Sequence, residues 1–306
     1  MRSFPGFHAL VAVVVASLFS VPAHAAGALR LKRAGATVDL VREGKSIATY
    51  NLQAPPNSGL PVEVGGYFHP LRTPKGVVVT DFVPSDHKHH RGLFLAWVEL
   101  HAAKDSDFWG WGALAPIKER RIVNRSFTPK RDGFQARNDW TAEDQVVIEE
   151  TLTAKSRRVS GVDVLDLEYR IVPRADTVLG RVAFSGFCLR VRKDGDIRFV
   201  SPDGPVDRPN PVYNKPESDW PNAAWYASEQ TLPDGARIGA AVLNHPSNPA
   251  SLWHNHRDVR MMNPCIVAPG AVSLTAGKPL VLKYRVATFD GATPTQVLNS
   301  LTRDWK

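Results

Sequence analysis

Cysteine is scarce in this chain, with two residues among 306, Cys188 and Cys265. Each stands in an apolar run, Phe187-Cys188-Leu189 and Pro264-Cys265-Ile266. An oxidising compartment would permit a disulfide, but two buried free thiols are at least as well supported, because sequence alone does not place the two sulfur atoms within bonding distance. Neither cysteine has the surroundings of a catalytic nucleophile.

Long apolar runs are also rare, and the clearest one lies near the N-terminus. Arg2 precedes an apolar stretch over residues 9–18, and Ala23-His24-Ala25 follows with small residues at alternate positions. This pattern is typical of a secretory signal peptide. The stretch is shorter than the roughly 20 residues that span a bilayer, so an uncleaved anchor is the weaker interpretation. We therefore expect a signal peptide over residues 1–25 and a soluble product that is periplasmic or secreted.

Runs of a single charge are missing as well. The 38 basic and 30 acidic residues give a net charge of +8 that is spread along the chain. The longest basic cluster, Lys118 to Arg121, is interrupted by Glu119. A nucleic-acid-binding protein would carry a basic stripe together with a recognisable motif. We therefore expect no nucleic-acid partner, and no membrane partner after signal cleavage.

Strand patterns dominate the rest of the sequence, and no linker or internal repeat divides residues 26–306, which we expect to form a single domain. Leu165, Leu167, Tyr169 and Ile171 alternate with charged residues, which is typical of a strand with one buried face. The segment 282–286 alternates in the same way. Further β-rich runs occupy residues 77–83, 93–100, 146–152, 178–184 and 238–243.

Turn signals lie between many of these runs. Asp-Gly pairs at 132–133, 194–195, 234–235 and 290–291 are strong hairpin signals. Strands joined by tight turns predict a mainly β protein, a large antiparallel β-sandwich or barrel. One helix is predicted at the C-terminus, where Thr293 is positioned as its cap and Pro294 as its first residue. Apolar residues then recur at helical spacing at Leu298, Leu301 and Trp305.

Several catalytic motifs are absent: there is no G-x-S-x-G elbow, no phosphate-binding glycine loop and no H-E-x-x-H. Histidine is instead concentrated in two short segments. The first is Ser85-Asp86-His87-Lys88-His89-His90-Arg91-Gly92. In an extended chain, neighbouring side chains point to opposite faces, so His87, His89 and Arg91 are expected on one side and His90 on the other. Asp86 is placed to orient a histidine ring.

The second segment runs from His245 to Asn263 and contains Trp253-His254-Asn255-His256-Arg257-Asp258. Like the first segment, it lies where a predicted strand gives way to a loop, the usual location of functional residues. Between the two segments, Trp109 and Trp111 alternate with glycines, which suits an exposed loop that offers flat faces to sugar rings.

Three interpretations of the histidines are open. They are satisfied locally by hydrogen bonds, or they bind a metal, or they supply acid/base chemistry for an oxygen-rich substrate. A divalent metal at His87 and His89 is supported by the His-x-His spacing, which His254 and His256 repeat, but no carboxylate follows to complete a facial triad. The third interpretation also explains the arginines and tryptophans, and it requires no cofactor.

The order and spacing of these motifs resemble a bacterial family of unknown function that is often labelled "PmoA-like, methane oxygenase". The resemblance covers roughly residues 30–305 and departs from the pattern at Lys88, where proline is expected. It implies a supersandwich of the galactose-mutarotase-like type and a role in carbohydrate metabolism. The methane label conflicts with the chain, because a particulate methane oxygenase subunit is a bundle of membrane helices. The motifs that carry the resemblance are Asp86-His87-x-His89-His90-Arg91-Gly92, Asp107-Phe108-Trp109, His245-Pro246-Ser247-Asn248-Pro249, His256-Arg257-Asp258 and Asn263-Pro264.

These observations predict an exported enzyme that acts on a glycoside or modified sugar by hydrolysis, elimination or epimerisation. A non-catalytic carbohydrate-binding module and a metal-dependent oxygenase using His87 and His89 are the alternatives. The expected catalytic residues are His90, His245, His256 and Arg91. The expected substrate-binding residues are Asp86, His87, His89, Trp109, Trp111, His254, Arg257 and Asn263.

Overall fold

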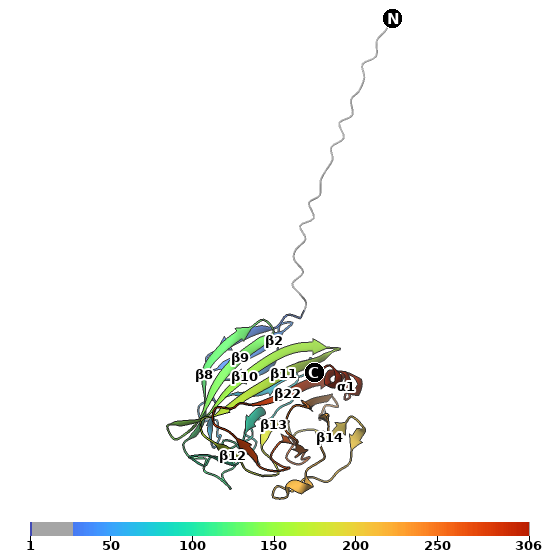
Figure 1. Ribbon diagram of the computed structural model, residues 1–306. Coiled ribbons are helices and arrows are strands. Elements are labelled where there is room, and N and C mark those ends of the chain that lie inside the picture. Colours follow the sequence, from blue (N-terminus) through green and yellow to red (C-terminus); the bar gives the residue numbers. More distant parts are fainter. Residues whose placement is uncertain (2–26, 306) are drawn as a thin grey trace.

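The computed structural model describes Met1 and residues 27–305 (Figure 1). The expected signal peptide, apart from Met1, therefore lies outside the described residues. Among the residues that are described, no helix is both long and apolar enough to cross a membrane.

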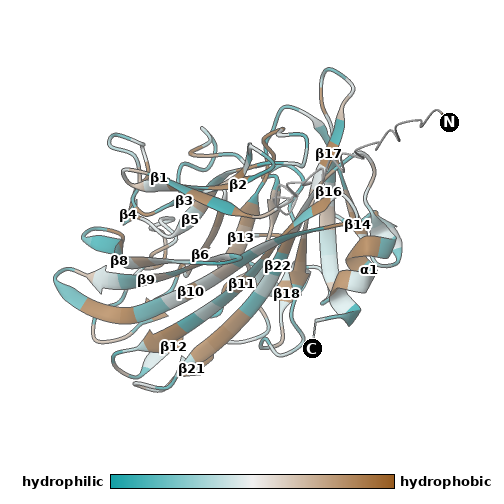
Figure 2. Cartoon of the chain, turned by 90° about the horizontal axis from the view of Figure 1, so that it is seen from above, coloured by the Kyte–Doolittle hydropathy of each residue, from teal (hydrophilic) through white to brown (hydrophobic). Residues whose placement is uncertain are grey.

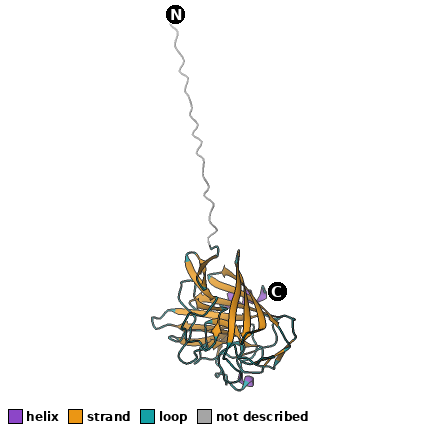
Figure 3. Ribbon diagram, turned by 90° about the vertical axis from the view of Figure 1, so that its left-hand side faces the viewer, coloured by secondary structure: helices purple, strands orange, loops and turns teal. Residues whose placement is uncertain are grey.

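Two large sheets form the body of the molecule, and the strands far outweigh the helices (Figure 3). Within the described strands, all neighbours in the two sheets are antiparallel except the short pair β4–β8. The predicted mainly β fold, an antiparallel sandwich with a C-terminal helix, is confirmed. The seven-stranded sheet has the order β1 (Arg30–Ala34), β2 (Thr37–Arg42), β3 (Lys45–Asn51), β5 (Tyr67–Leu71), β6 (Leu93–Ala96), β13 (Gly186–Arg190) and β19 (Met261–Met262).

The second sheet has ten strands, of which β8 to β11 and β22 make the long curved layer in Figure 1. Its order is β15 (Gly204–Val206), β14 (Asp196–Ser201), β16 (Trp225–Thr231), β17 (Arg237–Asn244), β22 (Leu280–Asp290), β11 (Val162–Pro173), β10 (Gln145–Val159), β9 (Gly133–Ala142), β8 (Arg120–Lys130) and β4 (Glu63–Val64). Smaller sheets join β21 (Val272–Leu274), β12 (Thr177–Leu179) and β7 (Leu100–His101), and β18 (Leu252–Trp253) with β20 (Pro264–Cys265).

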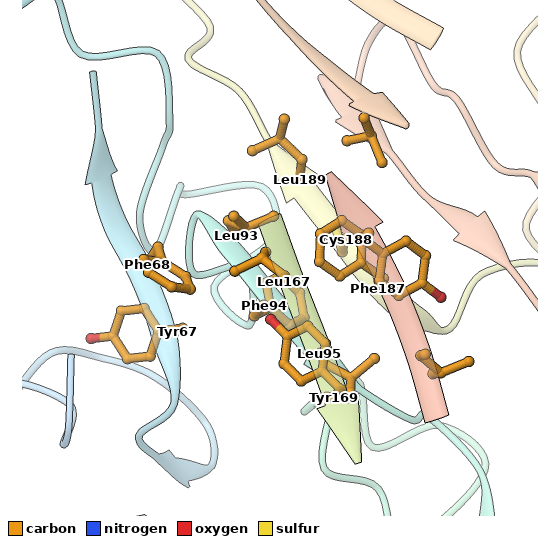
Figure 4. Close-up of a cluster of buried hydrophobic side chains, with 14 of the residues drawn as sticks. Tyr67, Phe68, Leu93, Phe94, Leu95, Leu167, Tyr169, Phe187, Cys188 and Leu189 are labelled. Carbon is orange, nitrogen blue, oxygen red and sulfur yellow. The ribbon is translucent and has the colours of Figure 1, made fainter. Parts of the chain in front are cut away.

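The main hydrophobic core lies between the two large sheets (Figure 4). Phe187 of β13 stacks on Tyr284 of β22 with ring centroids 4.0 Å apart. Leu167 and Tyr169 of β11 face the same core, as their alternation with Asp166 and Glu168 predicts. Burial of this apolar surface is the main force that holds the sheets together. Both cysteines are buried and free, so the two-thiol interpretation is confirmed.

Some predicted strands and hairpins are wrong. Residues 77–83 form only isolated bridges, because Val78, Thr80 and Phe82 each meet a different segment instead of one partner strand. Of residues 178–184, only the start belongs to a strand, β12. Residues 93–100 are split between β6 and the start of β7. The Asp-Gly pairs at 132–133 and 234–235 do join hairpins, whereas the pair at 194–195 ends the connection before β14 and the pair at 290–291 begins the one after β22, since Asp-Gly favours turns of several kinds.

The C-terminal helix α1 (Thr295–Arg303) packs against the outer side of the ten-stranded sheet, beside β16 and β17 (Figure 2). Leu298 and Leu301 are buried there, as predicted. Thr293 does not cap the helix, because its hydroxyl donates to the Glu229 carboxylate at 3.0 Å. A short 3₁₀ helix, η1 (Pro216–Ser218), interrupts the long loop before β16.

One carboxylate is buried inside the sandwich. Glu150 of β10 accepts hydrogen bonds from Asn138 Nδ2 at 2.7 Å and Trp140 Nε1 at 2.9 Å. Burial raises the pKa of Glu150 to about 7, because the charged form loses the solvation it has in water.

We predict that Glu150→Gln becomes more stable relative to wild type as the pH rises. The folded-state pKa lies above the ordinary value of 4.5, so the stability contributed by the protonated carboxyl is present below pH 4.5 and is lost as the pH rises through 7. The free energy of unfolding, measured with urea at pH 5 and at pH 8, gives the difference between variant and wild type at each pH. From pH 5 to pH 8 this difference should change by about 2 kcal/mol in favour of the variant. The control is the half-exposed neighbour, Glu149→Gln. An equal, pH-independent difference in both variants would contradict the prediction.

Candidate functional site

The first histidine segment is a tight turn rather than an extended strand. The amide of His90 donates to the carbonyl of His87 at 2.9 Å, which is the i to i+3 bond of a turn. The expected alternation of faces is therefore wrong, because the turn stacks the His87 and His90 rings with centroids 5.1 Å apart. His89 packs edge-on against His90 at 4.7 Å. Three imidazoles thus share one small volume, with His87 the most exposed.

A buried arginine that the sequence patterns did not indicate organises this turn. Arg190, at the end of β13, is 0% exposed. It donates to Nδ1 of His90 at 3.0 Å and to the Asp86 carboxylate at 3.0 Å. The other oxygen of Asp86 accepts from Nδ1 of His87 and from Lys193, both at 3.0 Å. Asp86 therefore orients His87, as predicted. In the sequence, the only indication of a role for Arg190 is its position at the end of an apolar strand.

Burial alone would raise the pKa of Asp86, but hydrogen bonds from His87 and Lys193 and the charge of Arg190 hold it well below its usual range. The carboxylate is therefore ionised and accepts the Nδ1 proton of His87. Burial, followed by the charges of His89 and Arg190, lowers the pKa of His90 well below its ordinary value. His90 is consequently neutral near pH 7.

Part of the second segment lies along one edge of β13, and the first segment lies along the opposite edge. Arg190 is paired with Met261 of β19, and Met261 is bridged in turn to His256. Directly paired residues of neighbouring antiparallel strands point to the same face, so Arg190, Met261 and His256 form one cross-strand row. The carbonyl of Gly92 accepts from the amide of Arg190, which places the first segment along the opposite edge.

His254 makes the shortest side-chain contact of a histidine in this region. Its Nδ1 lies 2.6 Å from a carboxylate oxygen of Asp219, and both side chains are buried. Burial raises the pKa of Asp219, while the hydrogen bond from His254 opposes that rise. Asp219 lies directly after η1 and, like Arg190, was not predicted. The ring of His256 follows at 6.1 Å from that of His254.

Burial lowers the pKa of His256 to about 4, and the charges of His254, His87 and Arg190 contribute to this shift. The cross-strand pairing of Arg190 with Met261, and of Met261 with His256, places this part of the second segment beside the strand that holds the first. That the two segments line one pocket stays a prediction.

The hydrogen bonds define which ring nitrogen of each histidine carries the proton. His87 and His254 donate from Nδ1 to carboxylates, so their Nε2 atoms are hydrogen-bond acceptors and bases. His90 and His256 accept at Nδ1, from Arg190 and from the amide of Val259, so their Nε2 atoms carry a proton and donate. The site therefore combines two basic nitrogens with two donors.

Arg91, which was predicted to be catalytic, and Trp109, which was predicted to bind substrate, are both buried in the protein interior. Arg91 donates to the backbone carbonyls of His89, Phe108 and Trp109 and thereby holds the loop after β7. Trp109 is 0% exposed and packs against His90, Phe94 and other rings, so the predicted open sugar-stacking face is wrong for this residue. Its position is explained by the size of the indole, which is more stable in the core than in water.

Asn263 and Arg257 also make contacts within the protein. Asn263 is fully buried and bonds to the amide and carbonyl of Ser185 and to the carbonyl of Phe187. Arg257 donates to the carbonyls of Val206 and Arg208 and so holds the loop that follows β15. Both side chains position backbone segments around the histidines.

His245 does not lie with the other five histidines. Its ring packs edge-on against Trp305 at 4.8 Å, and its Nδ1 accepts from the amide of Ser247. Burial lowers its pKa, as do the nearby charges of Lys283 and Arg285 of β22. Its neighbours thus belong to the ten-stranded sheet and the C-terminus. The sequence separation of nine residues from His254 spans a turn and β18, which carries the chain away.

Aromatic residues flank His254 on one side. Phe184 lies 5.5 Å from the His254 ring and 5.2 Å from Trp111, and Trp111 lies 5.9 Å from Tyr213. Trp111 is half-buried, and Tyr213 is 59% exposed. Trp111 therefore lies in a loop, as predicted for both tryptophans, but it is only partly exposed.

Within the part of the chain that the structure describes, no group of three or more histidine, cysteine, aspartate or glutamate side chains is arranged to hold a metal ion.

We predict that His256 titrates near pH 4 and is a neutral Nε2–H tautomer at pH 7. The low value follows from burial and from the neighbouring charges. Imidazole ¹⁵N NMR across pH 3–8 will report both the midpoint and the tautomer. His101 is the internal control, since Asp105 and Glu99 raise its pKa despite partial burial. A midpoint for His256 at or above about 6.5 would be inconsistent with the burial described here.

Comparisons with known proteins were made with both sequence and structure. No curated protein matches the sequence. Among solved structures, a kojibiose phosphorylase described as putative, from the human microbiome, is 8% identical with a TM-score of 0.39, and the match covers 88% of this chain but 31% of that one. A GH36 α-galactosidase from Geobacillus stearothermophilus is 10% identical with a TM-score of 0.39, with 86% of this chain and 41% of that chain covered.

A galactose mutarotase-like protein from Lactobacillus casei is also 10% identical with a TM-score of 0.39, with 85% of this chain and 99% of that chain covered. Similarity at this level assigns no activity. The resemblance inferred from the histidine motifs is confirmed as membership of a family of unknown function, and nothing in the comparisons supports the methane-oxygenase label. The model of the family of unknown function DUF6807 matches residues 37–303, and the chain therefore belongs to that family.

Proposed function

We propose that this protein is an exported enzyme that transfers protons on a sugar or a similar polyhydroxylated substrate. The observation that carries the proposal is the buried His254–Asp219 pair, with 2.6 Å between Nδ1 and the carboxylate oxygen. A carboxylate on Nδ1 fixes the tautomer, orients the ring and stabilises the imidazolium that forms when Nε2 accepts a proton. His254 is therefore the proposed general base.

His256 is the proposed hydrogen-bond donor to the reacting group. Its Nδ1 is occupied by the amide of Val259, so Nε2–H is the group available to a substrate oxygen. The low pKa keeps the ring neutral near pH 7, which makes Nε2–H a hydrogen-bond donor without a full positive charge. A base and a donor 6.1 Å apart between ring centroids can act on the two ends of one reacting group. Elimination and epimerisation of sugars use such a pair, in which the base removes a carbon-bound proton and the donor stabilises the negative charge that develops on the adjoining oxygen.

The sugar-like substrate class is supported by the aromatic residues beside His254. Trp111 and Tyr213 meet edge to face and come from two separate loops, and Tyr213 is mostly exposed. Sugar rings combine an apolar C–H face with a rim of hydroxyl groups, which suits an aromatic surface next to polar donors and acceptors. His87, with its basic Nε2 and partial exposure, supplies a further acceptor for substrate hydroxyls.

His90, Arg91, Arg257 and Asn263 have a different role in this proposal from the one that the sequence suggested. All four are committed to contacts inside the protein, so they position the site. The role of His89 is intermediate between binding substrate and positioning the site, because His89 is largely buried and packs on His90. His245 has no part in the proposed chemistry.

We predict that His254→Gln lowers turnover at least about 100-fold while substrate binding is retained, because the variant keeps the polar shape and lacks the base. Asp219→Asn should cause a smaller loss, since it removes the group that fixes the tautomer. Turnover is measured as the formation of product from a panel of glycosides and uronides, with the products detected by ion-exchange chromatography. Substrate binding is measured by calorimetry. His101→Gln, on the surface, is the matched control.

Unchanged turnover in both variants would overturn the assignment of His254. If the wild-type protein binds these sugars without converting any of them, the chain is a carbohydrate-binding protein and the enzymatic proposal is wrong.

We also predict that Tyr213→Ala and Trp111→Ala each raise KM about tenfold and change kcat little. Both residues lie to one side of the proposed base, so they would bind a ring that does not itself react. Loss of one stacking contact corresponds to roughly 1–1.5 kcal/mol. Steady-state kinetics with the best substrate separates the two parameters. The exposed Val212→Ala serves as the control, and a fall in kcat with constant KM would place the aromatic pair in the chemical step instead.

A further inference from the structure

The outer face of the ten-stranded sheet carries a hollow that the proposed histidine chemistry does not use. Its volume is about 360 Å³, and it is floored by β10, β11 and β22 and walled by Trp305. The opposite face of these strands packs on the core through Leu167, Tyr169 and Tyr284. The histidine site borders β13 of the other sheet, so the hydrophobic core separates the two places.

The floor of the hollow is built from residues in register on three neighbouring strands. Thr153 is paired with Glu168, and Glu168 with Lys283, which makes one cross-strand row. A second row consists of Lys155, Asp166 and Arg285. Alternation along each strand points these side chains away from the core. Donors and acceptors therefore alternate across the floor of the hollow.

Both carboxylates of this floor are paired with basic side chains. Glu168 and Lys283 lie 3.6 Å apart, and Asp166 accepts from Arg157 at 3.1 Å and also from Arg285. Such exposed ion pairs contribute little to stability by themselves. A neutral ligand with many hydroxyl groups matches this surface, because hydroxyls accept from the lysines and donate to the carboxylates.

Trp305 stands at the edge of the floor in a fixed orientation. The Arg285 guanidinium lies over its ring at 4.3 Å from the centroid, and the His245 ring meets it edge-on at 4.8 Å. The indole is half-buried, so part of its surface remains open to the hollow. Trp305 follows α1 directly, since that helix ends at Arg303. His245 thus has a role here, as a support for the indole.

We propose that this hollow is an accessory binding site for a short neutral oligosaccharide, separate from the histidine site and without catalytic activity. A flat aromatic wall beside alternating donors and acceptors fits a sugar ring, whose apolar face stacks and whose hydroxyls bond at the rim. The volume lies at the lower end of the range for small-molecule sites, which corresponds to one or two rings. The site would hold a polymeric substrate on the surface away from the point of reaction.

Isothermal titration calorimetry with cellohexaose, xylohexaose and maltohexaose tests the proposal. The wild-type protein should bind at least one of the three, and Trp305→Ala should weaken that binding tenfold or more. Trp305 also packs against the helix, so its replacement can disturb the fold as well as the site. Glu168→Ala and Lys283→Ala change exposed or half-exposed positions and keep the fold. Each of these two variants should weaken binding several-fold. Glu149→Ala, which breaks an ion pair with Arg174 elsewhere on β10, is the matched control.

Binding that is unaffected in Trp305→Ala, Glu168→Ala and Lys283→Ala would overturn the proposal, as would no binding of any of the three hexasaccharides. Binding that is lost only in Trp111→Ala would locate the sugar at the histidine site and would also overturn it. Turnover of a monosaccharide glycoside should be the same in Trp305→Ala and wild type. A failure of this site is therefore distinguishable from a failure of the proposed enzymatic function.

Discussion

The Arg190 guanidinium donates at the same time to the His90 ring and the Asp86 carboxylate, in a position that water does not reach. A buried charge of this kind is costly unless it is paired and hydrogen-bonded. Asp86 satisfies that requirement because Lys193 and His87 help to keep it ionised. The geometry of the first histidine turn follows from this pairing. Through Asp86, Arg190 also determines which nitrogen of His87 is basic.

Strand β13, which ends at Arg190, connects the two halves of the site. β13 is bordered by β6 on one side and by β19 on the other, and the paired residue Met261 leads on to His256. Because Phe187 of β13 also stacks on Tyr284 of the opposite sheet, the packing of the core fixes the position of the strand. Core and site are therefore not independent, and side chains such as Asn263 and Arg91 connect one to the other.

Much of the fold could be predicted from the sequence, because alternation is a local property. Leu165 to Ile171 shows the β11 strand directly, and the apolar spacing of Leu298 and Leu301 shows the helix. Residues 77–83 were mispredicted because they bridge to three separate segments instead of pairing with one strand, and Thr293 was mispredicted because its partner, Glu229, is distant in sequence. The same reason explains the site. The clustered histidines stand out in the sequence, whereas Arg190 and Asp219 become functional candidates only through long-range pairing, and burial of Trp109 is a result of packing.

The loop between β15 and β16 carries both Tyr213, at the proposed sugar surface, and Asp219, the partner of His254, with only η1 between them. A change in the length or sequence of this loop would therefore alter the aromatic surface and the orientation of the His254 ring together, so the two cannot vary independently.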